Sequence, residues 1–341
     1  MVTVIGGGIA GTVLAGALAR HGHPVTVYER QSGAGGGAFL VLDGHAHEVL
    51  DRLGVPGADL HAASYPVREL RFHHLPEGRR VADGHGQRLY RRTELMRVLS
   101  EFAAAADIRY DTPVTRLDPE TGALFSGARE ISGPGLVLAA DGTDSLARRR
   151  LEPERAARYA GQIIVYGTAT RPVQLPTEPE TMHFDGVPGP GPLPLATFGQ
   201  HWSGATASWF VRLTRDPIPQ QDNGTHPTAR WSDVLRQAAP RLSDTLDALL
   251  AATDQVHVSN TRIVPFADAA PPAAPVILCG DADHAITPAA ARGAREAIDD
   301  AAALITALTT GADPAAAMAR RRVEITAERE QSQRRFAPPR R

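Results

Sequence analysis

Cysteine is almost absent from this sequence, which contains a single residue of this type, Cys279, among 341 residues. One thiol cannot form an internal disulfide, and no pair of cysteines exists to relay electrons. The position of Cys279 inside the apolar stretch VILCG favours an inert core thiol over a nucleophile. Any redox chemistry therefore requires a bound cofactor.

Long apolar runs and an excess of charge are absent as well. No stretch approaches the ~20 consecutive apolar residues that a membrane-spanning helix needs, and the N-terminus lacks a basic segment followed by a cleavable apolar one. The formal net charge of −2 gives no electrostatic reason to expect nucleic acid or an anionic membrane as a partner. We therefore expect a cytoplasmic protein with a small-molecule partner, and the oligomeric state is not indicated.

The sequence does not indicate a metal site either. His45, His47, His73 and His74 have no spacing that yields three ligands together with a carboxylate. Hydrophobic residues make up 43% of the chain, which is enough for a large core in one domain or in two interleaved ones. We expect a globular protein without a metal.

The first thirty residues contain the pattern of a dinucleotide-binding unit. A short apolar strand (residues 2–5) leads into a glycine-rich turn, an Ala/Leu helix and a second strand that ends at Glu29. Gly6 permits a tight turn, Gly8 lets the backbone approach a pyrophosphate, and Gly11 lets the helix pack against the strand. Glu29 would accept hydrogen bonds from an adenosine ribose, and an acid at this position disfavours a 2′-phosphate. The predicted ligand is therefore FAD or NAD.

Two more acids follow predicted buried strands. GLVLAADG runs into Asp141 and Gly142, and VILCGDADH runs into Asp281. A carboxylate at the tip of a strand serves the hydroxyl groups of a ligand better than it serves core packing. The arginines at residues 148–150 are explained equally well by contact with a phosphate and by a solvated helix face.

The segments between these motifs predict a second, mixed sheet. Residues 67–92 contain three predicted strands of this sheet, VRELRFHH, RRVADG and RLYRR. Residues 158–270 alternate further strands with a helical stretch near residues 229–252 and hold all three tryptophans, Trp202, Trp209 and Trp231. This sheet is a candidate wall for a ligand cavity, with core packing as the alternative for each tryptophan.

Four motifs in a fixed order resemble a known family. GGGIAG with Glu29, the RTEL segment at Arg92, AADGTDSLAR and CGDADHAITP look like the motifs of FAD-dependent monooxygenases related to para-hydroxybenzoate hydroxylase, across almost the whole chain. The resemblance implies an α/β fold in which a Rossmann-like FAD-binding domain is interleaved with a mixed β-sheet substrate domain and C-terminal helices. The chain is short for this family, and we expect no added C-terminal domain. The predicted division is an FAD-binding domain over residues 1–65, 90–155 and 272–312, a substrate domain over 66–89 and 156–271, and a C-terminal helix and tail over 313–341.

The resemblance also assigns residues to the cofactor. It implies that Arg92 approaches the FAD pyrophosphate and that Asp141 and Gly142 support both FAD and a passing NAD(P)H. Asp281 would bind the ribityl chain or the pyrophosphate side. The complete set of predicted cofactor-binding residues is Gly6, Gly8, Ala10, Gly11, Glu29, Arg30, Arg92, Val114, Asp141, Gly142, Asp281, Pro288, Arg292, Gly293 and Ala294.

The predicted flavin edge departs from the family pattern. By resemblance, Pro288 lies against the isoalloxazine ring, and the helix that begins near Arg292 points its N-terminus at the pyrimidine edge. After Pro288 the family usually has Gly, any residue, Gly, any residue, Asn, whereas this chain places Ala291 and Arg295 at two of those positions. Ala291 adds a Cβ, and Arg295 replaces a neutral amide by a cation. We expect Arg292 or Arg295 to stabilise the anionic reduced flavin.

The predicted activity is an FAD-dependent monooxygenase that uses NAD(P)H and dioxygen to hydroxylate an aromatic or polyketide-like small molecule through a flavin C4a-hydroperoxide. FAD would be bound and NAD(P)H would be a diffusing co-substrate. Tyr166, His183 and His201 are the candidate bases for a phenolic substrate. Two alternatives stay open: a flavin oxidase or dehydrogenase that inserts no oxygen, and a flavoprotein that has lost catalysis and serves as a binding module.

Overall fold

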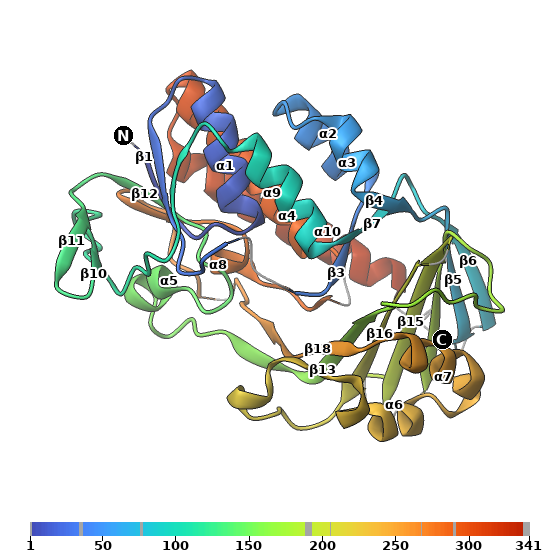
Figure 1. The fold of residues 1–341 in the computed structure, drawn as a ribbon. Helices are drawn as coiled ribbons and strands as arrows, with labels where there is room; N and C mark the ends of the chain where they lie inside the picture. Colours follow the sequence, from blue (N-terminus) through green and yellow to red (C-terminus); the bar gives the residue numbers. More distant parts are fainter. Residues whose placement is uncertain are drawn as a thin grey trace.

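The protein combines a parallel sheet covered by helices with a large, mostly antiparallel sheet (Figure 1). The predicted α/β fold, a Rossmann-like unit with a mixed sheet, is confirmed. Among the described residues, no helix is both long enough and apolar enough to cross a membrane. The computed structural model describes residues 2–33, 37–75, 78–187, 193–204, 206–266, 268–288 and 291–336.

The parallel sheet is built from short apolar strands that the rest of the fold buries. All of its neighbouring strands run parallel, and β1 pairs with β2 from Val2↔Val25 to Ile5↔Tyr28. Both faces are covered, which explains why these strands are continuously apolar. In spatial order the strands are β19 (Val276–Leu278), β12 (Leu136–Ala139), β1 (Val2–Ile5), β2 (Val25–Tyr28) and β8 (Asp107–Arg109).

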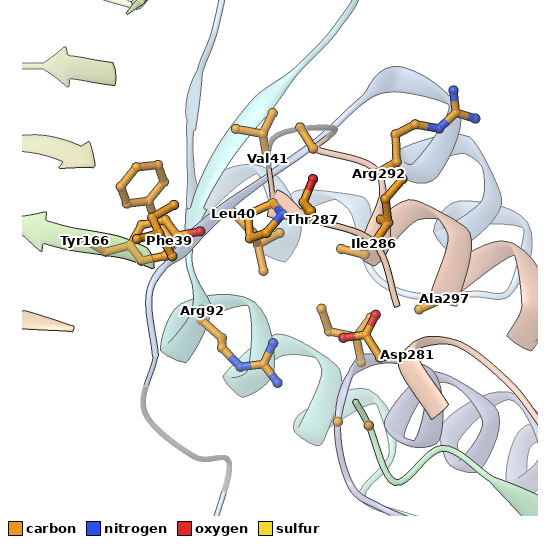
Figure 2. Close-up of a pocket in the computed structure, with 18 of the residues that line it drawn as sticks. Phe39, Leu40, Val41, Arg92, Tyr166, Asp281, Ile286, Thr287, Arg292 and Ala297 are labelled. Atoms are coloured by element: carbon orange, nitrogen blue, oxygen red, sulfur yellow. The ribbon is translucent and has the colours of Figure 1, made fainter. Parts of the chain in front are cut away.

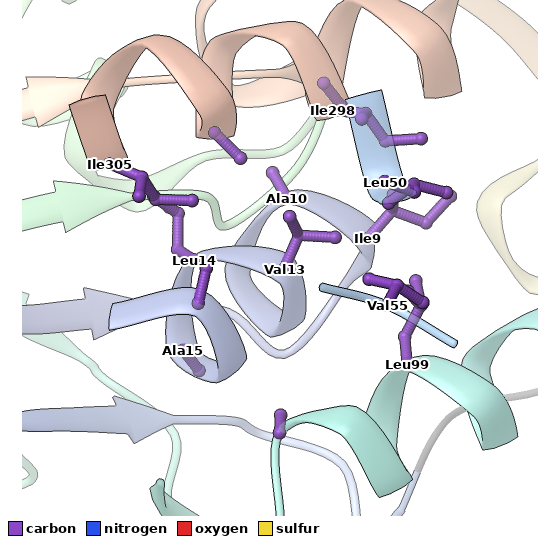
Figure 3. Close-up of a cluster of buried hydrophobic side chains, with 14 of the residues drawn as sticks. Ile9, Ala10, Val13, Leu14, Ala15, Leu50, Val55, Leu99, Ile298 and Ile305 are labelled. Atoms are coloured by element: carbon purple, nitrogen blue, oxygen red, sulfur yellow. The ribbon is translucent and has the colours of Figure 1, made fainter. Parts of the chain in front are cut away.

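One face of the parallel sheet is covered by helices packed around α1. Figure 3 shows Val13 and Leu14 of α1 among Leu99 of α4 and Ile298 and Ile305 of α9, in one buried cluster. Burying an aliphatic side chain of this size contributes about 1.5–3 kcal/mol, so this cluster anchors the turn that precedes α1. The helices of this layer are α1 (Ile9–Arg20), α2 (Gly44–Arg52), α3 (Gly57–Ala62), α4 (Arg92–Phe102), α9 (Gly293–Thr310) and α10 (Pro314–Phe336).

The opposite face of the parallel sheet packs against a small unit of three antiparallel strands and one helix. Leu117 and Leu124 of this unit and Ala147 of α5 are buried against Ile5 and Val137. The unit consists of β9 (Arg116–Leu117), β10 (Leu124–Ser126), β11 (Arg129–Ser132) and α5 (Leu146–Leu151).

The large sheet has two faces with different neighbours. Along β16, Trp209 and Val211 pack against helices α6 and α7, whereas Phe210 and Arg212 face the other way, toward a cavity. Strand alternation explains this division. The elements are β17 (Gly224–Pro227), β18 (Gln255–Ile263), β13 (Arg158–Thr168), β16 (Thr206–Thr214), β15 (Ala196–Ser203), β14 (Thr181–Val187), β5 (Glu69–Leu75) and β6 (Gly78–Asp83), with α6 (Ser232–Ala238) and α7 (Ser243–Ala252).

Two expectations about this region are corrected, whereas the tryptophans follow the core-packing explanation. Trp209 and Trp231 belong to the core under α6 and α7, and Trp202 packs against it. The predicted helical stretch near residues 229–252 is interrupted at Pro240, which begins a short 3₁₀ turn between α6 and α7. The predicted strand RLYRR is β7 (Arg88–Arg91), but it pairs with β3 (Phe39–Leu42) and β4 (Ser64–Pro66) in a separate small sheet.

Candidate functional site

The turn between β1 and α1 has the geometry expected of a nucleotide-binding turn. Gly6 has φ +98°, and a Cβ there would lie 2.5 Å from the carbonyl oxygen of Ala140. A Cβ on Gly11 would lie 1.9 Å from the carbonyl oxygen of Gly6, so only glycine lets the helix approach the strand this closely. Gly8 is the N-cap of α1, so no capping side chain accepts a hydrogen bond from the free N–H groups at the start of this helix. The N-terminus of α1 is therefore available to an anionic group.

A first cavity of about 530 Å³ lies in front of this turn; we name it the fingerprint cavity. Glu29 orients the turn, because its carboxylate accepts hydrogen bonds from the N–H groups of Gly7 (2.6 Å) and Gln31 (2.8 Å). The fingerprint cavity is lined by eight of the predicted cofactor-binding residues: Gly6, Gly8, Glu29, Arg30, Arg92, Val114, Asp141 and Gly142.

Asp141 lines the fingerprint cavity and caps α5 at the same time. Its Oδ2 accepts hydrogen bonds from the N–H groups of Leu146 (2.6 Å) and Ala147 (3.2 Å). Its Oδ1 is buried and has no hydrogen-bond partner among the described residues. Burial raises the pKa of Asp141, although hydrogen bonds from Ser145 and from the backbone oppose the shift. One carboxylate oxygen therefore fixes the loop, while the other is left for a ligand.

A second cavity of about 390 Å³, which we name the inner cavity, adjoins the first (Figure 2). The two cavities share Gly8, Arg92, Ala140 and Gly142 in their linings, so they lie next to each other. Every predicted cofactor-binding residue except Gly11 lines one of the two cavities. Those in the inner cavity that have not yet been named are Ala10, Asp281, Pro288, Arg292, Gly293 and Ala294.

Arg92 and Asp281 form the polar part of the inner cavity. Figure 2 shows the guanidinium of Arg92 extending from α4 toward the carboxylate of Asp281. Burial lowers the pKa of Arg92, and the charges of Asp281 and Glu29 oppose this shift. Burial also raises the pKa of Asp281, whereas the charges of His284 and Arg92 act to lower it. Asp281 begins α8 (Asp281–His284) directly after Gly280, whose φ of +57° turns the chain out of β19.

Three arginines hold the short helix α8 from three different segments of the chain. Arg148 donates a hydrogen bond to the carbonyl oxygen of Ala282 (2.7 Å), Arg155 to that of Asp283 and Arg329 to that of His284 (2.7 Å). Arg148 also donates to the carbonyl oxygens of Thr143 and Arg155 and is only 1% exposed. Arg148 is therefore a structural residue that holds α8, and the alternative of a phosphate contact is wrong for it.

A buried charge network lies directly behind α8. His284 Nε2 is 2.6 Å from Asp300 Oδ2, and Glu296 accepts a hydrogen bond from Arg329. Burial alone would lower the pKa of His284, but Asp300 and Glu296 outweigh it and raise this pKa to about 10. Burial likewise opposes ionisation of Glu296, yet His284 and Arg329 lower its pKa to about 2. His284 is thus a buried imidazolium, and helix α10 supplies Arg329 to the network.

The expected position of the arginines at the flavin edge is corrected. Arg295 does not line the inner cavity; its Nη1 lies 3.0 Å from Asp43 Oδ2, and Asp299 and Glu328 are 3.6 Å away. The guanidinium of Arg292 points away from the inner cavity in Figure 2 and pairs with Glu296 and Glu328. Both cations are paired with carboxylates, and the role of Arg292 at a reduced flavin stays a prediction. Ala291, by contrast, has the left-handed φ of +50° that favours glycine.

Of the three candidate bases, only Tyr166 lines the inner cavity. Burial raises the pKa of Tyr166, so its phenol stays protonated at neutral pH and is able to donate a hydrogen bond. His183 stacks on His73 with ring centroids 5.4 Å apart, whereas its strand neighbours Met182 and Phe184 line the cavity on the other face of the sheet. His201 Nε2 pairs with the carbonyl oxygen of Pro66 at 2.8 Å.

Two further observations concern metals and the thiol. The described residues contain no group of three or more His, Cys, Asp or Glu side chains arranged to hold a metal ion. Cys279 is fully buried, and burial raises its pKa well above the ordinary value for a thiol. A protonated, inaccessible thiol is not a nucleophile.

Arg212, which lines the inner cavity from β16, is not among the site residues predicted from the sequence. The signal for it was the alternation of ASWFVRL, in which Trp209, Val211 and Leu213 form one buried face. Arg212 lies with Phe210 on the opposite face. An arginine between buried strand residues, on the face away from the core, predicts a polar contact inside a cavity.

Comparison with known proteins agrees with this geometry. The family model described as "FAD binding domain" matches residues 1–320. The chain is 29% identical to a kynurenine 3-monooxygenase from Salinispora arenicola, over 93% of this chain and 74% of the relative. It is 28% identical to a 3-amino-4-hydroxybenzoate 2-monooxygenase from Streptomyces platensis, over 94% and 82%. The solved 2,6-dihydroxypyridine-3-hydroxylase from Arthrobacter nicotinovorans has the same fold, with a TM-score of 0.75, 19% identity and 94% and 86% coverage. The chain therefore belongs to the FAD binding domain family, among the FAD-dependent monooxygenases that its four motifs resemble.

Proposed function

We propose that this protein is an FAD-dependent monooxygenase that uses NAD(P)H and dioxygen to hydroxylate an aromatic or polyketide-like small molecule. The observation that carries the proposal is that the two cavities are neighbours, with Gly8, Arg92 and Gly142 in the lining of both. The fingerprint cavity suits a dinucleotide, and the inner cavity has aromatic walls. The names of two relatives support an aromatic substrate, since they specify kynurenine and an amino-hydroxybenzoate.

The residues present fit FAD. Glu29 would hold the adenosine ribose, the N-terminus of α1 and Arg92 the pyrophosphate, and Asp281 the ribityl chain, with Pro288 beside the ring. The FAD-binding domain would comprise residues 1–65, 90–155 and 272–312, and the substrate domain residues 66–89 and 156–271. When bound, FAD supplies the electron transfer and the activation of oxygen. The detailed route of oxygen transfer stays a prediction.

The protein's own contribution is binding, orientation and the exclusion of water. Tyr166, Phe184 and Phe210 of the large sheet form an aromatic wall together with Phe39 of β3 in the small sheet. Phe39 contacts Tyr166 edge to face, with ring centroids 5.5 Å apart. Such a wall suits a flat ring and keeps water from the reacting centre. A protonated Tyr166 would donate a hydrogen bond to the substrate rather than remove its proton.

NAD(P)H would be a diffusing co-substrate. The sequence contains a single glycine fingerprint, and the fingerprint cavity that it forms is assigned to FAD. The test is a screen of the FAD-loaded protein for oxidation of NADH and NADPH, with and without a panel of phenols and polycyclic aromatic compounds. We expect at least one compound to raise the rate well above its basal value. A rate that no compound changes, with either nucleotide, would contradict the proposal.

A further inference from the structure

A further cavity of about 630 Å³ lies where β7 and α4 meet the ends of β13 and β16. We name it the threonine cavity, because four residues of this type line it: Thr93, Thr168, Thr170 and Thr206. Its charged lining residues are Arg91 and Arg171, and the described residues around it include no Asp or Glu. Two guanidinium groups without a carboxylate in the lining favour an anionic ligand.

The two arginines of the threonine cavity differ in their partners. Arg171 donates hydrogen bonds to Asp254 Oδ1 (2.6 Å) and to the carbonyl oxygen of Ala251, so its charge is already balanced. Arg91 has a buried Nε without a hydrogen-bond partner, and no hydrogen bond or ion pair joins its guanidinium to any residue that the structure describes. A buried donor without an acceptor costs free energy that an anion in the cavity would recover. Arg91 is therefore the cation available to a ligand.

Three hydroxyl groups accompany Arg91 in this lining. Thr170 donates to the carbonyl oxygen of Ala252 and to Asp254, so its hydroxyl is already used. The hydroxyls of Thr93, Thr168 and Thr206 form no hydrogen bond with the described part of the chain. A phosphate has at least three acceptor oxygens, whereas a carboxylate has two. A guanidinium with several hydroxyl donors therefore fits a phosphate better than it fits a carboxylate.

The threonine cavity lies beside the space assigned to FAD and is not part of it. Phe39, the cross-strand partner of Arg91, lines both the inner cavity and the threonine cavity. Gly37 also lines the threonine cavity, and a Cβ at this residue would lie 2.8 Å from Cδ of Arg92. Arg92 itself lines the two cofactor cavities and not this one. Bound FAD would therefore leave the threonine cavity open to a second ligand.

We propose that the threonine cavity binds a phosphate group, with Arg91 as the cation and the free threonine hydroxyls as further donors. Two sources share this chemistry: the phosphates of a diffusing nicotinamide dinucleotide, and free phosphate. The position beside the cofactor space favours the dinucleotide. The phosphate site does not depend on the proposed function, and only its use by NAD(P)H rests on that proposal.

The test is calorimetric titration of the FAD-loaded protein with inorganic phosphate, 5′-ADP and 2′,5′-ADP at constant ionic strength. Bound FAD keeps these probes out of the fingerprint cavity. We expect at least one probe to bind, and Arg91→Gln to weaken it roughly tenfold to a hundredfold, as the loss of a charge-assisted hydrogen bond implies. Arg91→Lys should retain part of the affinity. Thr168→Val, which keeps the shape and removes a hydroxyl, should weaken binding by about twofold to tenfold.

Arg129→Gln is the matched control. Arg129 lies at an exposed position of β11, so its substitution removes the same charge from another part of the protein and should leave the affinity unchanged. Flavin occupancy equal to that of the parent shows that Arg91→Gln is folded. Acetate serves as the carboxylate probe and should bind at least about tenfold more weakly than the best phosphate probe. If no phosphate probe binds, if Arg91→Gln binds it as tightly as the parent, or if acetate matches it, the inference is wrong.

The three probes also distinguish the sources of the phosphate. Tighter binding of 2′,5′-ADP than of 5′-ADP would assign the site to the 2′-phosphate that NADPH carries and NADH lacks. Equal binding of the two nucleotides, both tighter than inorganic phosphate, would assign it to the phosphates that NADH and NADPH share. Inorganic phosphate that binds as tightly as either nucleotide would support a site for free phosphate and would overturn its use by NAD(P)H.

The outcome is separable from that of the proposed function, because the titrations measure binding and require no turnover. Phosphate binding that depends on Arg91, in a protein that never oxidises NAD(P)H faster with any aromatic compound, would retain the phosphate site and reject the monooxygenase proposal. Substrate-stimulated turnover in a protein that binds none of the phosphate probes would do the reverse.

Discussion

The two ends of the inner cavity differ in how the protein balances buried charge. At the cofactor end, Arg92 faces Asp281 and Glu29, and Arg148 donates to backbone carbonyl groups behind the site. At the substrate end, Arg212 has no acceptor among the described residues. The difference teaches that two carboxylates oppose the burial of the cation at the cofactor end, whereas at the substrate end only Tyr166 does so for Arg212.

The strongest way to test the cofactor end is to remove Arg148. Arg148→Met leaves the carbonyl oxygens of Thr143, Arg155 and Ala282 without a donor, so the free energy of unfolding should fall by about 3–6 kcal/mol. Chemical denaturation measures this change. Arg150→Met, at an exposed position of the same helix, should change stability by less than about 0.5 kcal/mol. An equal loss of unfolding free energy in the two variants would show that Arg148 does not stabilise the cofactor end through these carbonyl groups.

Asp281→Ala tests whether the same end serves FAD. Loss of the carboxylate removes an acceptor for the cofactor and leaves Arg92 without its main counter-charge, so FAD affinity should fall roughly a hundredfold, or about 2–3 kcal/mol. Flavin occupancy measures the loss, and circular dichroism should show an unchanged fold. Asp59→Ala, at an exposed position in the first turn of α3, is the control. Full flavin occupancy in Asp281→Ala would refute the assigned role.

The sequence predicted the cofactor end far better than the substrate end. The residues around Gly6, Asp141 and Asp281 lie in short contiguous stretches whose chemistry depends on local turns, so pattern alone locates them. The roles of Arg148 and Arg212 depend on what lies across the fold: three carbonyl groups for the first and an apolar cavity for the second. Sequence spacing does not encode those neighbours, and the same reason explains why Arg295 was expected at the flavin.

The pH dependence of stability tests whether His284 is charged in the network behind α8. The pKa of His284 is about 10 in the folded protein against 6.5 for the unfolded residue. Its stabilising contribution is therefore complete below about pH 6.5 and is lost as the pH rises toward 10. Between these values the free energy of unfolding should fall by up to about 1.4 kcal/mol per pH unit for this one proton.

Denaturation curves at several pH values measure that slope. In His284→Gln the fall above pH 6.5 should be smaller than in the parent protein. His85→Gln, which replaces an exposed histidine, should keep the parent slope. Identical slopes in all three proteins would show that His284 is neutral in the folded state.

The smallest expected effect concerns Arg295, whose side chain pairs with Asp43. Because Arg295 does not line the inner cavity, Arg295→Asn should leave the reduction potential of the bound flavin unchanged. Loss of the half-buried pair should cost only about 0.5–1 kcal/mol of stability. Spectroelectrochemistry measures the potential, and a clear decrease in Arg295→Asn would restore the original expectation of a cation at the flavin edge.

The measurement that tests the central claim most directly is isotopic. The FAD-loaded protein is supplied with NAD(P)H, labelled dioxygen and an aromatic compound that stimulates turnover, and the product is weighed by mass spectrometry. The monooxygenase account predicts one labelled oxygen atom in the product. A product without label, formed together with stoichiometric hydrogen peroxide, would contradict it and show that this scaffold acts as an oxidase.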